Sequence, residues 1–270
     1  MLNPIQSVQY AHFTAGEFQS AETEVIVETP VSLTVNGSPW LTFMCTPVNL
    51  EAMAVGFLYN EGVIESIEEV ADIRLCEHGD NLDVWLKFEV ERPDFSRRTS
   101  GCTGGVTSIT AGQNESDSAT SLPLVDDLHI SPELIGQLID LLFESQQLYR
   151  ESGGVHTSAL SDGERILVSA EDIGRHNTFD KLTGLCLQGN IWPKQRILLT
   201  TGRISSEMLQ KAARLGVRIL VSRTSPSSLS IEMAEKRGLT LIGYARRNRF
   251  NVYTHPERLF EKQPQGIKNK

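Results

Sequence analysis

The residue with the clearest chemical potential is Cys102, which lies in the segment RRTSGCTGG at residues 97–105. The thiolate is the nucleophilic form of cysteine, and positive charge from neighbouring arginines favours that form at neutral pH. The flanking glycines permit unusual backbone conformations and let another molecule approach closely. The pattern predicts a reactive, accessible cysteine; a free thiol in an ordinary surface loop is the alternative.

Two further polar segments could contribute to a site. His156 lies in GGVHTS at residues 153–158, and the segment EDIGRHN at residues 171–177 holds Asp172, Arg175 and His176. The second segment precedes a helix predicted from residue 178 to 187, so free N–H groups and the positive end of the helix dipole lie beside it. Five ionisable or amide side chains in seven residues exceed what a helix cap needs, which predicts a binding or catalytic site.

Zinc chemistry and cysteine hydrolysis are the alternatives for these residues. Cys102, His156 and His176 are zinc ligands by type, but no pair has the usual Cys-x₂-Cys or His-x₃-His spacing. The His-x-Glu and Pro-Cys-x-x-Cys signature of zinc nucleobase deaminases is also missing, so we expect no intrinsic metal. A cysteine hydrolase remains open, with Cys102 as nucleophile, either histidine as base and Asp172 as the orienting group.

The elements that must position these residues fall into two parts. In the first 110 residues we predict strands at 24–27, 31–35, 40–44 and 83–90, a turn at Asn36-Gly37, and a helix beginning at Asn49 with Met53, Val55, Phe57 and Leu58 on its apolar side. Cys45 and Cys76 follow predicted strands, so packing in the core or at an edge explains them. Residues 111–127 are small and polar, which predicts a flexible connector.

The second part spans residues 128–270. We predict a helix from Ser131 to Leu148, a hairpin of 155–160 with 165–169, and then strands at 196–200, 217–221 and 239–243 that alternate with helices at 205–215 and 227–236. Alternation of this kind predicts parallel βαβ units, in which ligands bind beyond the carboxyl ends of the strands. Arginines occur at or beyond all three strand ends: Arg203 after the first strand, Arg223 after the second, and Arg246 and Arg249 after the third. This pattern predicts an anion site.

Composition sets limits on the protein's class. The chain has 270 residues, 40% of them hydrophobic and 22% charged, with a net charge of −9. Residues 1–95 hold sixteen acidic side chains against three basic ones, whereas residues 203–249 hold ten basic against three acidic. The local basic region favours an anionic ligand, and no aromatic interleaving indicates nucleic acid. No apolar run approaches the ~20 residues of a membrane helix.

The four cysteines and the first residues bear on the compartment. Cys45, Cys76, Cys102 and Cys186 are widely spaced, and the start MLNPIQ lacks the basic and apolar regions of a secretory signal. We therefore expect a cytoplasmic protein with free thiols rather than disulfides.

Several of these segments together resemble one family. GVHTSA at 154–159, EDIGRHN at 171–177 with Asp180-Lys181, GRISSEM at 202–208, VSR at 221–223, SP at 225–226 and FNVYT at 250–254 are similar to motifs of the FdhD-type formate dehydrogenase accessory sulfurtransferases. The resemblance extends from about residue 20 to 255.

The resemblance implies sulfur transfer. Members of the family accept sulfur from a cysteine desulfurase as a cysteine persulfide. They pass it to the molybdenum bis(guanine dinucleotide) cofactor, and the cofactor then matures formate dehydrogenase. Cys102 matches the persulfide cysteine. Many members carry a second loop cysteine three residues later, where this chain has Gly105, so Cys102 is expected to act alone.

The resemblance also implies a fold and a binding site. The expected fold is α/β: a cytidine-deaminase-like α/β/α sandwich without zinc in the C-terminal domain, with a smaller mixed α+β N-terminal domain, in a homodimer. GDP or GTP would mimic the cofactor, with no nucleic acid or membrane partner. The residues expected to bind the cofactor are His156, Asp172, Arg175, His176, Arg203, Arg223, Phe250, Asn251, Val252, Tyr253, Thr254 and His255. A non-catalytic chaperone for the cofactor or for a guanine nucleotide is the first alternative, with an incidental Cys102.

Overall fold

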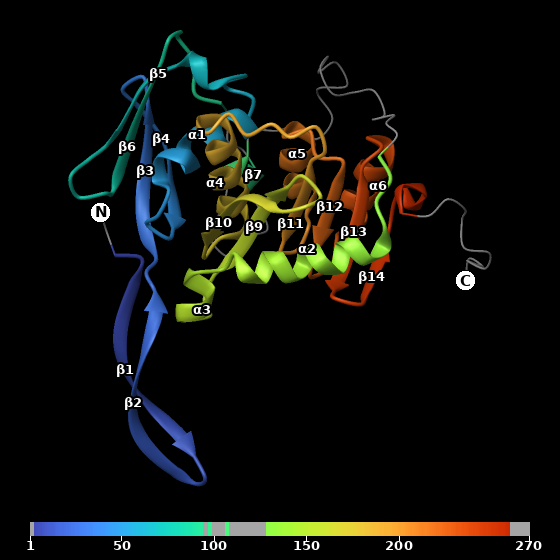
Figure 1. The fold of residues 1–270 in the computed structure, drawn as a ribbon. Helices are drawn as coiled ribbons and strands as arrows, with labels where there is room; N and C mark the ends of the chain where they lie inside the picture. Colours follow the sequence, from blue (N-terminus) through green and yellow to red (C-terminus); the bar gives the residue numbers. More distant parts are fainter. Residues whose placement is uncertain (1–2, 94–96, 99–105, 108–127, 260–270) are drawn as a thin grey trace.

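The computed structural model describes residues 3–93, 97–98, 106–107 and 128–259 (Figure 1). Cys102 and the connector expected at 111–127 lie outside the described residues. Two mixed sheets form the body of the described chain, one of four strands and one of six, each with its own helices. Within the described part, none of the helices has the length and apolar character needed to cross a membrane.

The smaller sheet forms the N-terminal part and has the strand order β4-β3-β6-β5. Its elements are β3 (Thr29–Val35), β4 (Ser38–Cys45), α1 (Leu50–Asn60), the 3₁₀ turn η1 (Ile67–Glu69), β5 (Val70–Leu75) and β6 (Asn81–Leu86). The predicted hairpin around Asn36-Gly37 is confirmed, since both residues have positive φ and join β3 to β4. The predicted helix is confirmed too, with Asn49 at its N-cap and all four predicted apolar residues buried.

A long two-stranded hairpin precedes this sheet. Strand β1 (Ile5–Thr14) pairs with β2 (Glu17–Ile26) along their whole length, and Figure 1 shows the pair extending away from the body of the molecule. The sequence predicted only a short strand at 24–27. Nearly every side chain of the hairpin is exposed, so it lacks the one-sided apolar alternation that marks a half-buried strand.

The larger sheet has the strand order β10-β9-β11-β12-β13-β14. Its strands are β9 (His156–Ser161), β10 (Ile166–Asp172), β11 (Ile197–Thr200), β12 (Ile219–Ser222), β13 (Thr240–Arg246) and β14 (Arg249–Val252). The predicted parallel core is confirmed, because β11, β12 and β13 are parallel. The predicted β9–β10 hairpin is also confirmed, and β9 joins β11 as an antiparallel neighbour.

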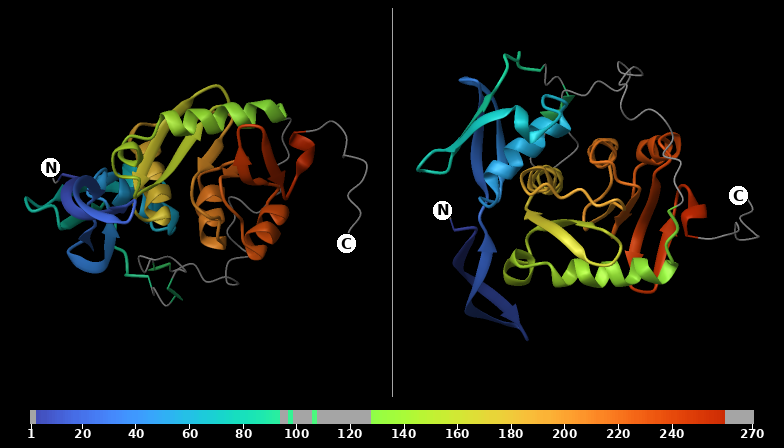
Figure 2. Two further views of the ribbon diagram at one scale, coloured as in Figure 1. Left: turned by 90° about the horizontal axis from the view of Figure 1, so that it is seen from below. Right: turned by 45° about the horizontal axis from the view of Figure 1, so that its top comes forward.

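Helices cover both faces of this sheet, giving three layers (Figure 2). They are α2 (Pro132–Glu144), α3 (Leu148–Ser152), α4 (Arg175–Gln188), α5 (Ser206–Arg214) and α6 (Ser228–Lys236), followed by the 3₁₀ turn η2 (Pro256–Arg258). Alternate strand residues enter separate cores: Leu198 and Leu220 pack with α4, α5 and α6, whereas Ile197 and Ile219 pack with α2. The chain is therefore mixed α/β, with three layers around its larger sheet.

Three predicted boundaries were wrong. The helix predicted from 131 to 148 ends at Glu144, and Glu171 caps a separate helix α3 by accepting bonds from three of its first N–H groups. Helix α4 begins at Arg175 rather than 178. The strand predicted at 83–90 ends at Leu86, where the Asn36 side chain accepts from the Leu86 N–H and donates to the Phe88 carbonyl.

The two sheets are joined by close packing of α1 against α4. A Cβ on Gly56 would lie 1.8 Å from the Asp180 carbonyl oxygen, and a Cβ on Gly184 would lie 1.8 Å from that of Ala52. Only glycine permits this approach of the two backbones. The helices therefore fix the smaller sheet against the edge of the larger one.

Candidate functional site

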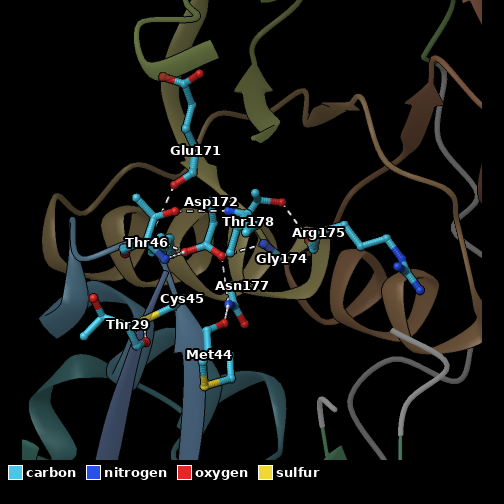
Figure 3. A network of polar contacts seen from close by, with 12 residues as sticks. Thr29, Met44, Cys45, Thr46, Glu171, Asp172, Gly174, Arg175, Asn177 and Thr178 are labelled. Carbon is cyan, nitrogen blue, oxygen red and sulfur yellow. Dashed lines mark hydrogen bonds and ion pairs between the residues drawn. The ribbon is translucent and has the colours of Figure 1, made fainter. Parts of the chain in front are cut away.

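Asp172 of the predicted segment 171–177 lies in a buried junction, whereas the side chain of Glu171 extends away from it (Figure 3). Asp172 is fully buried at the end of β10. Its Oδ1 accepts from the Gly174 N–H at 2.7 Å and from Asn177 Nδ2 at 2.8 Å, and its Oδ2 accepts from the Thr46 N–H at 3.0 Å and from Lys181 Nζ at 2.5 Å. Both oxygens thus have two donors each.

The same junction ties the two sheets together. Lys181 is fully buried and its Nζ also donates to the Thr46 carbonyl at 2.9 Å, while Asn177 Nδ2 donates to the Met44 carbonyl at 2.9 Å. Met44 and Thr46 lie at the end of β4 in the smaller sheet. The structure therefore places Asp172, predicted to line the pocket, where its carboxylate holds the fold together. Buried charges persist only when they are paired in this way.

The basic half of the segment points elsewhere. Figure 3 shows the Arg175 side chain extending away from Asp172, at the start of α4. The Arg175 side chain packs against Gly202: a Cβ added at Gly202 would lie 2.9 Å from the Cβ of Arg175. Gly202 lies two residues beyond the carboxyl end of β11, so Arg175 and His176 are placed at the strand ends where ligands usually bind.

Hydroxyl side chains connect the carboxyl end of β11 and the adjacent amino end of the antiparallel strand β9 with α4. Ser158 Oγ lies 2.7 Å from Thr178 Oγ1 and donates to Thr200 Oγ1 at 3.0 Å. Thr201 Oγ1 accepts from the Thr157 N–H at 3.0 Å and lies 3.3 Å from His156 Nδ1. These bonds fix the orientation of the His156 ring at the strand end.

His176 lies against the first turn of α5. Its Nε2 is 3.2 Å from Glu207 Oε2, at an orientation that does not make a regular hydrogen bond. Burial lowers the pKa of His176, and the contact with Glu207 opposes that shift only in part. The contact with His176 lowers the pKa of Glu207.

The pKa of His156 is lowered as well, first by burial and then by the positive charge of Arg175. Both imidazoles are consequently neutral at neutral pH, with one nitrogen of each able to accept a hydrogen bond or a proton.

Three arginines lie at or beyond the carboxyl ends of the parallel strands. Arg223 stacks its guanidinium 4.2 Å from the ring centre of Phe143, and its pKa is lowered by partial burial and by the charge of Arg246. Arg246 Nη1 donates to the carbonyls of Arg223 and Ala245 at 2.7 and 2.8 Å. Arg203 is exposed. Together with His156 and His176, these cations make the carboxyl edge a site suited to phosphate or another anion.

The predicted residues 250–255 do not form one cluster. The ring of Phe250 and the side chain of Val252 pack toward the α2 core, and Asn251 is exposed. Tyr253 packs on the other face, and its ring shares the space over Gly243 with Thr224 and Pro226. Of the six, Tyr253 is thus placed beside residues of the carboxyl edge.

The last two of these residues lie at the opposite edge of the sheet. Thr254 Oγ1 donates to the Leu239 carbonyl at 2.7 Å and accepts from the Leu241 N–H, at the amino end of β13. His255 Nδ1 lies 3.0 Å from Glu257 Oε1, and its Nε2 lies 3.0 Å from the Glu235 carbonyl. An antiparallel strand such as β14 necessarily carries its chain from one edge of the sheet to the other.

Sequence reasoning did not single out Thr201 or Glu207. Thr201 follows the strand end directly, and Glu207 is an acid in the first turn of α5, two residues after the N-cap Ser205. A hydroxyl beyond a parallel strand and an acid at the next helix start are each common, so neither position alone signals a site.

Burial makes two of the three described cysteines poor nucleophiles. Burial raises the pKa of the Cys45 and Cys186 thiols to about 12. Cys76 donates its thiol proton to Asp80 Oδ1 at 2.9 Å.

Cys102 itself lies outside the described residues, between two short strands. The backbone of β7 (Arg97–Arg98) pairs with that of β8 (Val106–Thr107), on either side of residues 99–105. Among the described residues, no group of three or more His, Cys, Asp or Glu side chains is arranged to hold a metal ion.

Comparisons with known proteins give one consistent result. Residues 26–260 match the model of the FdhD/NarQ family. The chain is 37% identical over 252 residues to the sulfur carrier protein FdhD of Bacillus subtilis (strain 168), covering 92% of this chain and 95% of that protein. It is 33% identical over 251 residues to the sulfur carrier protein FdhD of Staphylococcus aureus (strain MRSA252), covering 92% and 94%.

A solved structure agrees with these relatives. The crystal structure described as that of a formate dehydrogenase accessory protein from Desulfotalea psychrophila superposes with a TM-score of 0.79 at 32% identity, covering 96% of this chain and all of that one. Fold and sequence are thus similar over nearly the whole chain.

Proposed function

Because the chain belongs to the FdhD/NarQ family, we propose that it is a sulfur carrier required for the maturation of formate dehydrogenase. Cys102 carries the sulfur as a persulfide, which it receives from a cysteine desulfurase. The acceptor is the molybdenum bis(guanine dinucleotide) cofactor, bound as a substrate, and the client is a formate dehydrogenase.

The observation that carries this assignment is the state of the other cysteines. Cys45 and Cys186 are buried thiols with pKa values raised to about 12, and Cys76 is engaged with Asp80. Cys102 is the remaining cysteine of the sequence, and two arginines precede it. Positive charge of this kind favours the thiolate that sulfur transfer needs.

The transfer steps balance as thiol exchange. The Cys102 thiolate attacks the terminal sulfur of the desulfurase persulfide, a new S–S bond forms on Cys102, and the desulfurase thiolate leaves. Release of that sulfur as sulfide requires two electrons. We assign an external thiol as their source, and this thiol ends in a disulfide with Cys102. An external thiol is needed because Gly105 stands where many relatives carry a second loop cysteine.

The carboxyl edge of β11, β12 and β13 is the proposed place for the cofactor's nucleotide arms. Arg203, Arg223 and Arg246 suit pyrophosphate, since the planar guanidinium binds two phosphate oxygens at once. Tyr253 offers a ring for a guanine base, and GDP or GTP serves as a mimic of the arm. His156 and His176 supply neutral hydrogen-bonding groups beside it.

Three wider features belong to the same proposal. The three-layered part of the chain is proposed to be a cytidine-deaminase-like sandwich, on the basis of its mixed sheet with helices on both faces. The working form is proposed to be a homodimer, and its compartment the cytoplasm, where free thiols stay reduced.

Complementation in cells tests the function. In a strain that lacks its own copy of this protein, the wild-type chain and Cys76→Ala are expected to restore formate dehydrogenase activity, whereas Cys102→Ala restores none and accumulates to the same level. Full activity with Cys102→Ala would overturn the sulfur-carrier proposal. If guanine nucleotides still bound to that active variant, the protein would be a non-catalytic cofactor chaperone. Esterase or amidase activity lost in Cys102→Ser would instead indicate a hydrolase.

A further inference from the structure

A second basic feature lies at the opposite edge of the larger sheet. A cavity of about 130 Å³ is lined by the side chains of four cationic residues and by three small or apolar residues: Lys194, Arg196, Arg218 and Arg237, with Ala213, Gly216 and Leu239. Among the residues that the structure describes, no acidic one lines it. In a chain with a net charge of −9, such a cavity is a local concentration of positive charge.

The strand register brings the cations together. Arg196 and Arg218 directly precede β11 and β12, and the Arg218 N–H donates to the Arg196 carbonyl at 3.0 Å. The residues after them, Ile197 and Ile219, are paired in register and pack toward α2. The two arginines therefore share the other face, beside the end of α5. Like charges at directly neighbouring positions of a sheet destabilise it, so folding alone does not favour this pair.

Arg196 is held in place by the backbone. Its Nε donates to the Pro193 carbonyl at 3.1 Å and its Nη1 to the Leu215 carbonyl at 3.0 Å. Gly216 makes room for it, because a Cβ there would lie 2.3 Å from Arg196 Nη1. Burial and the charge of Arg218 lower the pKa of Arg196. The guanidinium is thus fixed before any ligand arrives.

Stabilisation of helix ends explains only part of this arrangement. Cations near a helix C-terminus interact favourably with its dipole, and the bond from Arg196 to Leu215 satisfies a carbonyl at the end of α5. Lys194 and Arg237 make no side-chain hydrogen bond or ion pair with any described residue. Their positive charges face the cavity without a role in the described fold.

We propose that this cavity is a phosphate-binding site, separate from the carboxyl-edge site and able to hold the diphosphate group of a ligand. Its volume is several times the roughly 30 Å³ that one water occupies in the liquid, which leaves room for tetrahedral anions. Arginine's fork matches phosphate oxygens, and lysine adds a compact charge. The ligand is either an inorganic polyphosphate or a nucleotide, since both present the same group.

Calorimetric titration with inorganic pyrophosphate tests the proposal. The carboxyl-edge arginines also attract phosphate, so the titration uses Arg203→Gln/Arg223→Gln protein at low salt. We expect pyrophosphate to bind this protein and its affinity to fall as salt rises. Adding Lys194→Gln and Arg237→Gln to this protein is expected to raise the Kd for pyrophosphate about tenfold or more. Lys236→Gln, the exposed neighbour on α6, is the matched control and is expected to leave binding unchanged.

ADP distinguishes the two sources. Binding of ADP tighter than that of pyrophosphate indicates a nucleotide, whereas equal or weaker binding indicates an inorganic polyphosphate. The proposal is overturned if pyrophosphate does not bind the Arg203→Gln/Arg223→Gln protein, or if Lys194→Gln/Arg237→Gln and Lys236→Gln affect binding equally. Thermal unfolding of each variant shows that it is folded. The outcome is independent of sulfur transfer, because it is read from pyrophosphate binding, and Lys194, Arg237 and Lys236 have no part in the proposed transfer site.

Discussion

The buried junction between the sheets and the carboxyl edge of the parallel strands use similar residue types in opposite ways. In the junction, Asp172 has four donors on its two oxygens, and Lys181 donates to three oxygens. At the carboxyl edge, His156 has one contact through Thr201, and His176 meets Glu207 without a regular hydrogen bond.

The difference separates stability from binding. A buried charge with every lone pair and proton engaged has nothing left for a ligand, and its removal exposes its partners to an unfavourable environment. Neutral imidazoles and the exposed guanidinium of Arg203 can exchange water for a ligand. One segment, residues 171–177, supplies both kinds of residue within seven positions.

Breaking the junction is expected to have the largest effect. Lys181→Met leaves the Asp172 carboxylate fully buried without its ion-pair partner, and removing one partner of a buried pair costs about 3–5 kcal/mol of the free energy of unfolding. Urea denaturation measures the loss. Lys236→Met, at an exposed lysine, is the control and is expected to change stability by no more than about 0.5 kcal/mol. A loss of the same small size in Lys181→Met would show that the junction is not what holds the sheets.

A smaller effect is expected from pH at the carboxyl edge. The pKa values of His156 and His176 are lowered in the folded protein. At pH values between these lowered pKa values and the ordinary histidine pKa near 6.5, the unfolded chain therefore binds more protons than the folded protein. Their contribution to stability is therefore complete above that ordinary pKa and is lost as the pH falls below it. We expect urea denaturation to give a lower free energy of unfolding at pH 5.5 than at pH 7.5.

The double variant His156→Gln/His176→Gln checks the source of that pH dependence. It is expected to reduce the difference between the two pH values, whereas His12→Gln, on the exposed hairpin, leaves it unchanged. The groups facing His176 are Glu207, Lys211 and Arg175, none of which titrates in this interval by its ordinary pKa. An undiminished difference in the double variant would contradict the assignment of the lowered histidine pKa values.

The sequence predicted the elements whose side chains divide clearly between core and solvent. The alternation of strands and helices after residue 196 and the turn at Asn36-Gly37 both depend on local patterns, and the structure contains them. The β1–β2 hairpin was mostly missed because its exposed strands carry no apolar face. The separate helix α3 was missed because Glu171, which caps its first turn, is distant in sequence.

The site was predictable in location but not in the roles of its residues. Strand ends in an α/β pattern indicated the carboxyl edge, and Arg175 and His176 lie there. Sequence does not reveal that Asp172 turns inward, because that depends on Thr46 and Lys181 from other elements. Nor does it reveal that residues 250–255 cross from one edge of the sheet to the other, since this follows from the pairing of β14 with β13.

Intact-protein mass spectrometry after incubation with a cysteine desulfurase and cysteine tests the central claim most directly. Wild type and Cys76→Ala are expected to gain one sulfur, about 32 Da, which a reducing agent removes, as for other reversible thiol caps. Cys102→Ala is expected to gain none. A reducible gain of the same size in Cys102→Ala, or none in wild type under conditions in which the desulfurase itself carries a persulfide, would contradict the assignment of Cys102 as the sulfur carrier.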